Sequence, residues 1–242
     1  MRVGSLTDIG KIRTSNEDSL GIDLERGIFI VADGMGGHQA GEVASHRAVE
    51  SIMEALGERD LVEPVTDALR QAVTYANSRI ELAAQQDRNL KGMGTTVVTA
   101  IVMDKHKRFA IAHVGDSRAY LIRKARIQQL TEDHSMVAEL VRTGIISPEA
   151  AAKHPYRSAI SRSLGQCKNV EVDIIEGDWL EEDRLLLCTD GLTRFVDNTE
   201  LIECILRIED PQLACKQLVD LALERGGHDN ITVILIVHTA RD

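Results

Sequence analysis

The stretch Ile28–His38 constrains this chain most, because an apolar run ends there in an aspartate and a glycine-rich turn. The run 28–32 is typical of a buried strand. Three glycines follow Asp33 and allow the backbone to turn sharply or to approach a ligand closely. A single Asp-Gly after a strand usually marks only a turn, since both residues are favoured there. A metal-binding role for Asp33 therefore requires the same pattern elsewhere in the chain.

The pattern recurs, because several other acids lie where an apolar strand begins or ends. Asp190 follows the apolar run 185–188 and precedes a glycine, in the same order as Asp33. The remaining acids of this kind are Glu17, Asp18, Asp116 and Asp229. Clustered carboxylates repel one another, so such a cluster requires a compensating cation. Carboxylate oxygens without a His/Cys set suit a hard ion, and the sequence predicts two bound Mg²⁺ or Mn²⁺ ions.

Arg13 lies a few residues before the first of these acids. A guanidinium beside a carboxylate–metal centre suits a phosphate, because it binds two oxygens at once. An isolated arginine at this position would be interpreted as a solvated surface residue. Beside the predicted cluster, Arg13 becomes the candidate phosphate ligand.

Apolar periodicity divides the rest of the chain into strands and helices. Residues 40–57 and 64–87 carry apolar stripes at helical spacing, whereas runs rich in Val, Ile and Thr predict strands. Three strands, 95–103, 108–114 and 118–123, are expected to form an antiparallel meander. We also expect strands at 1–10, 18–24, 27–32, 171–177, 183–189 and 230–238 and helices at 135–144, 198–208 and 211–225.

This order of elements predicts an α+β fold in which two stacked antiparallel sheets are flanked by helices. A single domain is expected over residues 1–242. The less regular segment at about 135–163 is expected to be a small appendage to that domain.

Bulk composition narrows the class of protein. The net charge of −10 argues against nucleic acid and anionic membranes as main partners. The four cysteines show no paired spacing, which favours free thiols in a reducing cytoplasm over a disulfide or zinc framework. We find no N-terminal signal stretch and no apolar run of the ~20 residues that a membrane helix needs. A cytoplasmic monomer is therefore expected.

Seven short motifs occur in an order that resembles a known family. They are Arg13 with Asn16-Glu17-Asp18, Asp33-Gly34-Met35-Gly36-Gly37-His38, Gly94-Thr95-Thr96, Gly115-Asp116-Ser117-Arg118, Ser163-Leu164-Gly165, Thr189-Asp190-Gly191 and Asp229-Asn230. The ordered set resembles the metal-dependent protein serine/threonine phosphatases of the type 2C (PPM) family, and most closely their compact stand-alone bacterial members. Each motif alone is weak, but the resemblance spans about residues 3–238.

The resemblance implies a metal ligand at each matched acid. Asp33 would bridge two ions. Glu17 and the carbonyl of Gly34 would hold one of them, and Asp190 and Asp229 would hold the other.

The resemblance also implies supporting roles around these ligands. A third, weaker ion would be held by Asp116 together with Asp190. Asp18, acting through water, and Asn230 would support the ligands from behind. Arg13 would bind the phosphate of the substrate.

The proton donor is the one role that the motif leaves open. Many animal members carry a histidine directly after Asp-Gly, where it is thought to protonate the leaving group, but this chain carries Met35. His38 lies three residues further on and is a candidate for that role. Orientation of the substrate and packing of the turn are the alternatives for His38, and a metal-bound water is the alternative donor.

The implied activity is hydrolysis of phosphoserine and phosphothreonine in proteins by a metal-activated water, in opposition to a bacterial serine/threonine kinase. The implied fold is a four-layer αββα sandwich whose flap, at 135–163, contributes to substrate choice. A catalytically inactive signalling module of the same fold and another two-metal phosphoesterase, such as a nuclease, are the alternatives. The complete set of acids with Arg13 argues against the first alternative, and the net charge argues against the second.

Overall fold

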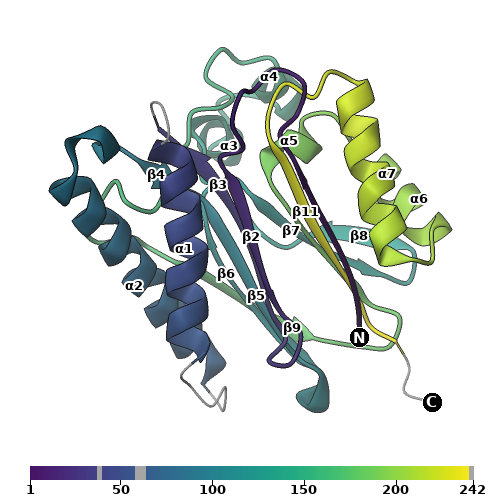
Figure 1. The fold of residues 1–242 in the computed structure, drawn as a ribbon. Helices are drawn as coiled ribbons and strands as arrows, with labels where there is room; N and C mark the ends of the chain where they lie inside the picture. Colours follow the sequence, from purple (N-terminus) through teal and green to yellow (C-terminus); the bar gives the residue numbers. More distant parts are fainter. Residues whose placement is uncertain (37–39, 58–63, 240–242) are drawn as a thin grey trace.

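The computed structural model describes residues 1–36, 40–57 and 64–239. Two antiparallel sheets stack face to face, and helices cover the outer face of each (Figure 1). The strand order is β1-β11-β10-β7-β8 in one sheet and β2-β3-β5-β6-β9 in the other, where β4 pairs with β3. This arrangement confirms the predicted α+β sandwich. The strands are β1 (Arg2–Asp8), β2 (Asp18–Asp23), β3 (Ile28–Met35), β4 (Gly94–Thr95), β5 (Val97–Met103), β6 (Arg108–Val114), β7 (Arg118–Arg123), β8 (Arg126–Gln129), β9 (Asp173–Asp178), β10 (Arg184–Cys188) and β11 (Ile231–Val237).

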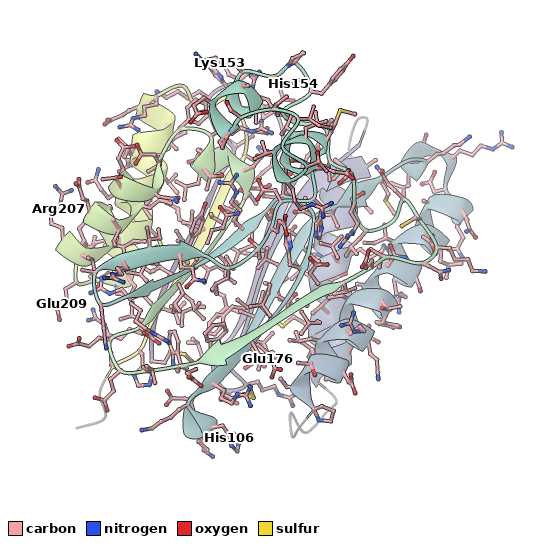
Figure 2. All side chains as sticks on the ribbon, turned by 180° about the vertical axis from the view of Figure 1, so that it is seen from behind. His106, Lys153, His154, Glu176, Arg207 and Glu209 are labelled. Atoms are coloured by element: carbon pink, nitrogen blue, oxygen red, sulfur yellow. The ribbon has the colours of Figure 1, made fainter. Side chains whose placement is uncertain are left out.

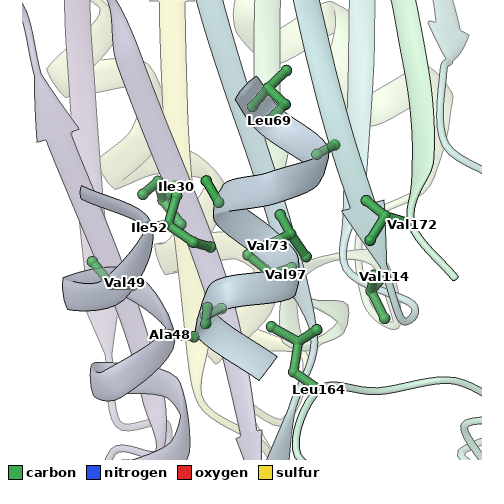
Figure 3. Close-up of a cluster of buried hydrophobic side chains, with 14 of the residues drawn as sticks. Ile30, Ala48, Val49, Ile52, Leu69, Val73, Val97, Val114, Leu164 and Val172 are labelled. Atoms are coloured by element: carbon green, nitrogen blue, oxygen red, sulfur yellow. The ribbon is translucent and has the colours of Figure 1, made fainter. Parts of the chain in front are cut away.

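Two pairs of helices bury their apolar stripes against the sheets, as the helical spacing predicts. α1 (Ala40–Gly57) and α2 (Val65–Gln86) pack together, and Ile52, Leu69 and Val73 contact the core there (Figure 3). Complete burial of such a side chain contributes about 1.5–3 kcal/mol. α6 (Asn198–Arg207) and α7 (Pro211–Glu224) cover the other sheet. The three clusters of buried apolar residues thus correspond to the three interfaces of the four layers.

The predicted meander is wrong in its third strand. β5 and β6 pair with each other, but β7 pairs with β10 and β8 in the opposite sheet. The chain crosses between the sheets at Gly115, whose φ of +112° is unfavourable for other residues. A Cβ at Gly115 would also lie 2.5 Å from the Cβ of Thr96. The turn thus lies at the interface of the two sheets.

The first glycine-rich turn begins later than expected. β3 continues through Asp33 and Gly34 to Met35, because these residues pair with β2 and β4. The periodicity also missed three short elements, since each spans only one turn of helix or a few strand residues. They are β8, α4 (Pro148–Ala152) and α5 (Asp190–Thr193).

The segment with α3 (Met136–Arg142) and α4 lies at the same end of the sandwich as α5 (Figure 1). Backbone hydrogen bonds connect the two ends of this segment. Met136 N–H donates to Ala159 O at 2.9 Å, and Ser161 N–H donates to His134 O at 2.8 Å. Lys153 and His154 lie at its outer tip (Figure 2). Within the described residues, no helix combines the length and the apolar character that crossing a membrane requires.

Candidate metal centre

The six predicted acids come from both sheets and converge at the end of the sandwich that carries α5. Asp18 and Asp33 are direct cross-strand partners in β2 and β3. Asp190 begins α5 immediately beyond β10, and Asp229 lies two residues before β11. The structure therefore brings together acids that are more than 200 residues apart in the sequence.

Burial and mutual repulsion raise the pKa of these carboxyl groups. Burial raises the pKa of Asp18 to about 7, and the charges of Asp190 and Asp229 add to this effect. Burial is also the main reason why the pKa of Asp116 is raised to about 7 and that of Asp190 to about 6. The pKa of Asp33 lies well above its ordinary value, because the group is buried and because Asp18, Asp190, Asp116 and Asp229 surround it. The protein alone therefore does not compensate this concentration of negative charge.

Three of the acids have a carboxylate oxygen that is buried without a hydrogen-bond partner. These atoms are Oδ1 of Asp18, Asp116 and Asp190. Buried polar atoms nearly always have a partner, so three orphaned acceptors in one cluster require an explanation. A divalent cation satisfies such oxygens directly, and an all-oxygen donor set suits Mg²⁺ or Mn²⁺. The residues present therefore fit the two ions that the sequence predicts.

Two glycines allow the Glu17 segment to lie against β3 and α1. A Cβ at Gly34 would collide with the carbonyl oxygens of Gly41 and Glu17. A Cβ at Gly41 would collide with the carboxylate of Glu17 itself. Both positions therefore require glycine so that Glu17 approaches the Asp33 strand.

The backbone of Asp33 is fixed from the neighbouring strand. Asp33 N–H donates to Thr96 Oγ1 at 3.0 Å, and Thr95 Oγ1 donates to Asp33 O at 2.8 Å. Thr96 Oγ1 is in turn 2.7 Å from Ser117 Oγ, beside Asp116. The motif Gly94-Thr95-Thr96 thus joins the Asp33 strand to the Asp116 turn.

Asn230 fixes the loop that carries Arg13 and Glu17. Its Oδ1 accepts from Glu17 N–H at 2.8 Å, and its Nδ2 donates to Ile9 O at 2.9 Å and to Ser15 O at 3.0 Å. The side chain is buried, so these bonds are shielded from water. Asn230 therefore attaches the 9–17 loop to the residue that precedes β11.

Two arginines approach the acids from solvent. Arg13 Nη2 lies 2.8 Å from Asp229 Oδ1. Arg194 pairs with Asp190 Oδ2 and lies 3.2 Å from Asp229 Oδ2. Sequence reasoning missed Arg194, although the spacing of four residues after Asp190 is that of a helical ion pair.

The other polar residues of the motifs are differently placed. Arg118 forms a bidentate pair with Asp133, at 2.8 and 2.7 Å, and therefore supports the Asp116 turn. His228 packs edge-on against Phe195. The candidate acid His38 lies outside the described residues.

A second polar cluster, of His113, His134 and Asp173, lies behind the Asp116 turn. Gly115 N–H donates to His134 Nδ1 at 3.0 Å, which assigns the ring proton to Nε2. This proton faces Asp173 Oδ2 at 3.1 Å, and Arg162 reaches Asp173 Oδ1 at 2.7 Å. A protonated Nε2 is not a metal ligand, and a guanidinium already neutralises the carboxylate. His134 and Arg162 therefore link the 134–162 segment to Asp173 of β9 by hydrogen bonds, whereas the two ring nitrogens of His113 are buried without a partner among the described residues.

A cavity of about 1100 Å³ opens beside the acids, between α3, α4 and α5. Asp116, Asp190 and Asp229 lie at one side of it, and Val137 and Phe195 add apolar surface. The cavity is therefore large enough for peptide residues that flank a group bound at the acids.

Comparison with known proteins matches this chain to one family. The family model described as "Protein phosphatase 2C" matches residues 12–221. The chain belongs to the protein phosphatase 2C family. This confirms the resemblance that the ordered motifs indicate.

Individual relatives of this phosphatase 2C chain agree with the family model. The chain is 43% identical over 236 residues to the serine/threonine phosphatase stp of Listeria monocytogenes, which covers 95% of this chain and 93% of that protein. The crystal structure of the Mycobacterium tuberculosis serine/threonine phosphatase PstP/Ppp superposes with a TM-score of 0.92 at 36% identity, covering 99% of both chains. A structure of the catalytic domain of PstP in complex with 2 manganese ions gives a TM-score of 0.88 at 34% identity, covering 98% of both chains.

Proposed function

We propose that this chain is a metal-dependent protein phosphatase that hydrolyses phosphoserine and phosphothreonine. The observation that carries the proposal is the cluster of buried acids with unpartnered oxygens, flanked by Arg13. Relatives that cover nearly the whole chain are serine/threonine phosphatases, and one was solved with 2 manganese ions. When bound, two divalent ions supply Lewis-acid stabilisation of phosphoryl oxygens and a nucleophilic water at neutral pH.

The metal ligands in this proposal are Asp33, Glu17, Gly34 through its carbonyl, Asp190 and Asp229. Asp33 bridges the two ions, because it lies among the other acids and its backbone is fixed by Thr95 and Thr96. Asp116 and Asp190 hold a third, weaker ion, and Oδ1 of each is available for it. The buried, unpartnered Oδ1 atoms of Asp116 and Asp190 support the roles of these two residues.

The remaining residues bind and orient the substrate. Arg13 binds the phosphoryl oxygens and neutralises the charge that develops on them, since its guanidinium lies at the solvent side of the acids. His38 is our candidate for protonating the leaving group. Asp18 and Asn230 keep the ligands in position, through Thr189, which donates to Asp18 Oδ2 at 2.9 Å, and through the bonds of Asn230 to the 9–17 loop.

The flap at 135–163 selects among protein substrates in this proposal. The cavity beside the acids is lined on one side by Val137, Ala138 and Val141 of α3. Side chains of a bound phosphopeptide would therefore contact the flap while its phosphate contacts Arg13. The physiological substrates include a serine/threonine kinase and its targets. The enzyme acts as a cytoplasmic monomer, and its four free cysteines support a reducing compartment.

Phosphate release from a phosphothreonine peptide, with Mn²⁺ and with chelator, tests the function. We expect Mn²⁺-dependent turnover that falls by at least ~100-fold in Asp33→Asn, because an amide is a poor ligand for a bridging position. Asp220→Asn is the matched control, since it removes one carboxylate from an exposed helix position on α7. Without metal, Asp33→Asn should be at least as stable as the wild type, because it relieves repulsion among buried acids. Absence of metal-dependent turnover in the wild type would refute the proposal, and turnover of nucleic acid alone would favour the nuclease.

A further inference from the structure

Arg194 contacts two acids of the cluster at once. It is the C-cap residue of α5 and pairs with Asp190, the first residue of the same helix. Its other Nη atom lies 3.2 Å from Asp229 Oδ2. We propose that Arg194 is a tethered counter-ion that competes with divalent metal ions for Asp190 and Asp229 and thereby lowers the metal affinity of this enzyme. The inference rests on the metal-dependent function proposed above.

The oxygens of Asp229 show why competition must arise. Oδ1 accepts from Arg13 at 2.8 Å and from Asn230 N–H at 3.0 Å, and Oδ2 faces Arg194. Both oxygens of this proposed ligand are therefore engaged by guanidinium groups. An ion that binds Asp229 has to displace one of these groups or accept its repulsion.

Arg194 is the group that is free to leave. Arg13 belongs to the loop that Asn230 fixes through Ile9 O and Ser15 O. Arg194 instead lies at the end of a helix of four residues. It also lines the cavity beside the flap, which offers the guanidinium a solvated position away from the ions.

The charge balance of the site points in the same direction. When all six acids are ionised, they face two guanidinium groups that have no other carboxylate partner among the described residues, those of Arg13 and Arg194. Arg118 lies near but is neutralised by Asp133. The four remaining negative charges equal the charge of two divalent ions. Without Arg194, five negative charges remain uncompensated, and the site attracts cations more strongly.

The interaction also extends to Asp116, the other proposed ligand of the weak third ion. Asp116 and Asp190 line one cavity together with Arg194, and Arg194 pairs directly with Asp190. Arg194 thus supplies part of the positive charge that a third ion would supply at these acids. We therefore expect its removal to strengthen the weakest metal site as well as the Asp190–Asp229 site.

Titration of chelator-treated protein with MnCl₂ by isothermal calorimetry tests the inference. Arg194→Gln should bind Mn²⁺ about tenfold more tightly than the wild type, and its melting temperature without metal should be lower, because repulsion between Asp190 and Asp229 is no longer compensated. Arg194→Lys keeps the charge but loses the two-pronged contact, so its Mn²⁺ affinity should lie between the two. Arg2→Gln is the matched control, since Arg2 also bridges two acids, Glu209 and Asp210, and is exposed.

The outcomes separate the two proposals. Equal or weaker Mn²⁺ binding by Arg194→Gln, with the wild type binding normally, overturns the counter-ion role. Tighter binding by Arg2→Gln to the same extent also overturns it, because the effect would then reflect net charge alone. Failure of the wild type to bind Mn²⁺ overturns the proposed function instead. If Arg194→Gln does not fold, Arg194→Lys decides, and unchanged affinity in that variant counts against the inference.

Discussion

Replacement of Asn230 by alanine should affect both stability and metal binding, because this one side chain makes three hydrogen bonds to the 9–17 loop of the site. Its amide accepts from Glu17 N–H and donates to Ile9 O and Ser15 O, at 2.8 to 3.0 Å. The same loop has two further attachments to this part of the chain, since Lys11 N–H donates to Gly227 O at 2.7 Å and Arg13 pairs with Asp229, but neither contacts Glu17. In Asn230→Ala, the loop therefore gains freedom while the fold is retained.

The expected cost follows from the bonds that are lost. Each of the three hydrogen bonds contributes about 1 kcal/mol, so the free energy of unfolding should fall by about 3 kcal/mol. Looser placement of Glu17 should weaken Mn²⁺ binding by about 10–100-fold, which is the usual effect of removing a residue that orients a metal ligand. KM for a phosphopeptide should rise as well, since Arg13 lies on the same loop.

Asn77→Ala provides the matched control. Asn77 is also a buried asparagine, and its amide donates to Cys167 O at 2.9 Å and accepts from Gly165 N–H at 2.8 Å. It joins α2 to the segment after the flap and contacts none of the acids. Loss of two bonds should cost about 2 kcal/mol, with little change in Mn²⁺ affinity.

Urea unfolding and calorimetric titration with Mn²⁺ measure the two effects separately. The unfolding midpoint should fall in both variants with an unchanged slope, which shows that stability alone has changed. Mn²⁺ affinity should fall only in Asn230→Ala. If both variants lose stability and neither loses Mn²⁺ affinity, then other contacts hold the loop, and our account of Asn230 is wrong.

Three further perturbations examine other parts of the structure. Gly34→Ala should unfold or fail to express in soluble form, because its Cβ has no space, whereas Gly57→Ala, whose Cβ meets only an arginine side chain at 3.5 Å, should retain the wild-type melting temperature. Burial lowers the pKa of His113 to about 3, so its neutral form stabilises the fold above the unfolded pKa of about 6.5, and this stabilisation is lost as pH falls. Urea midpoints should therefore show that the wild type loses about 2 kcal/mol more than His113→Leu between pH 7 and 5, and equal losses would contradict this. Deletion of residues 145–160 should change the preference among phosphopeptides more than the hydrolysis of a small aryl phosphate, and equal losses on both substrates would show that the flap does not select substrates.

Much of the fold could be predicted because periodicity reports burial directly. The apolar stripes of α1 and α2 and the alternation of apolar and polar residues in the strands arise because only some side chains enter the three apolar layers. Periodicity does not report which sheet a strand joins. β7 has the same apolar character as β5 and β6, so only the crossing at Gly115 separates it from them. That crossing depends on contact with Thr96, which no local pattern predicts.

The site could be predicted to the level of its acids, because each acid lies at a recognisable boundary in the sequence. The groups that neutralise or position these acids were harder to find. Thr96 and Ser117 carry ordinary hydroxyl groups, and their importance arises only where β3, β5 and the Asp116 turn meet. Their hydrogen bonds link residues 63 and 21 positions apart, so spacing along the chain holds no signal for them.

Arg194 was missed for a different physical reason. Its spacing from Asp190 is informative only if 190–194 is helical, and Gly191 favours a turn over a helix in the sequence. The structure shows why glycine is required there, since a Cβ at Gly191 would collide with the carbonyl oxygen of Asn230. The glycine therefore allows α5 to approach the Asp229 segment, and this approach places Arg194 between Asp190 and Asp229. In the sequence, Gly191 indicates only a local turn, but in the structure it allows two distant segments to come into contact. That contact places Arg194 at the site.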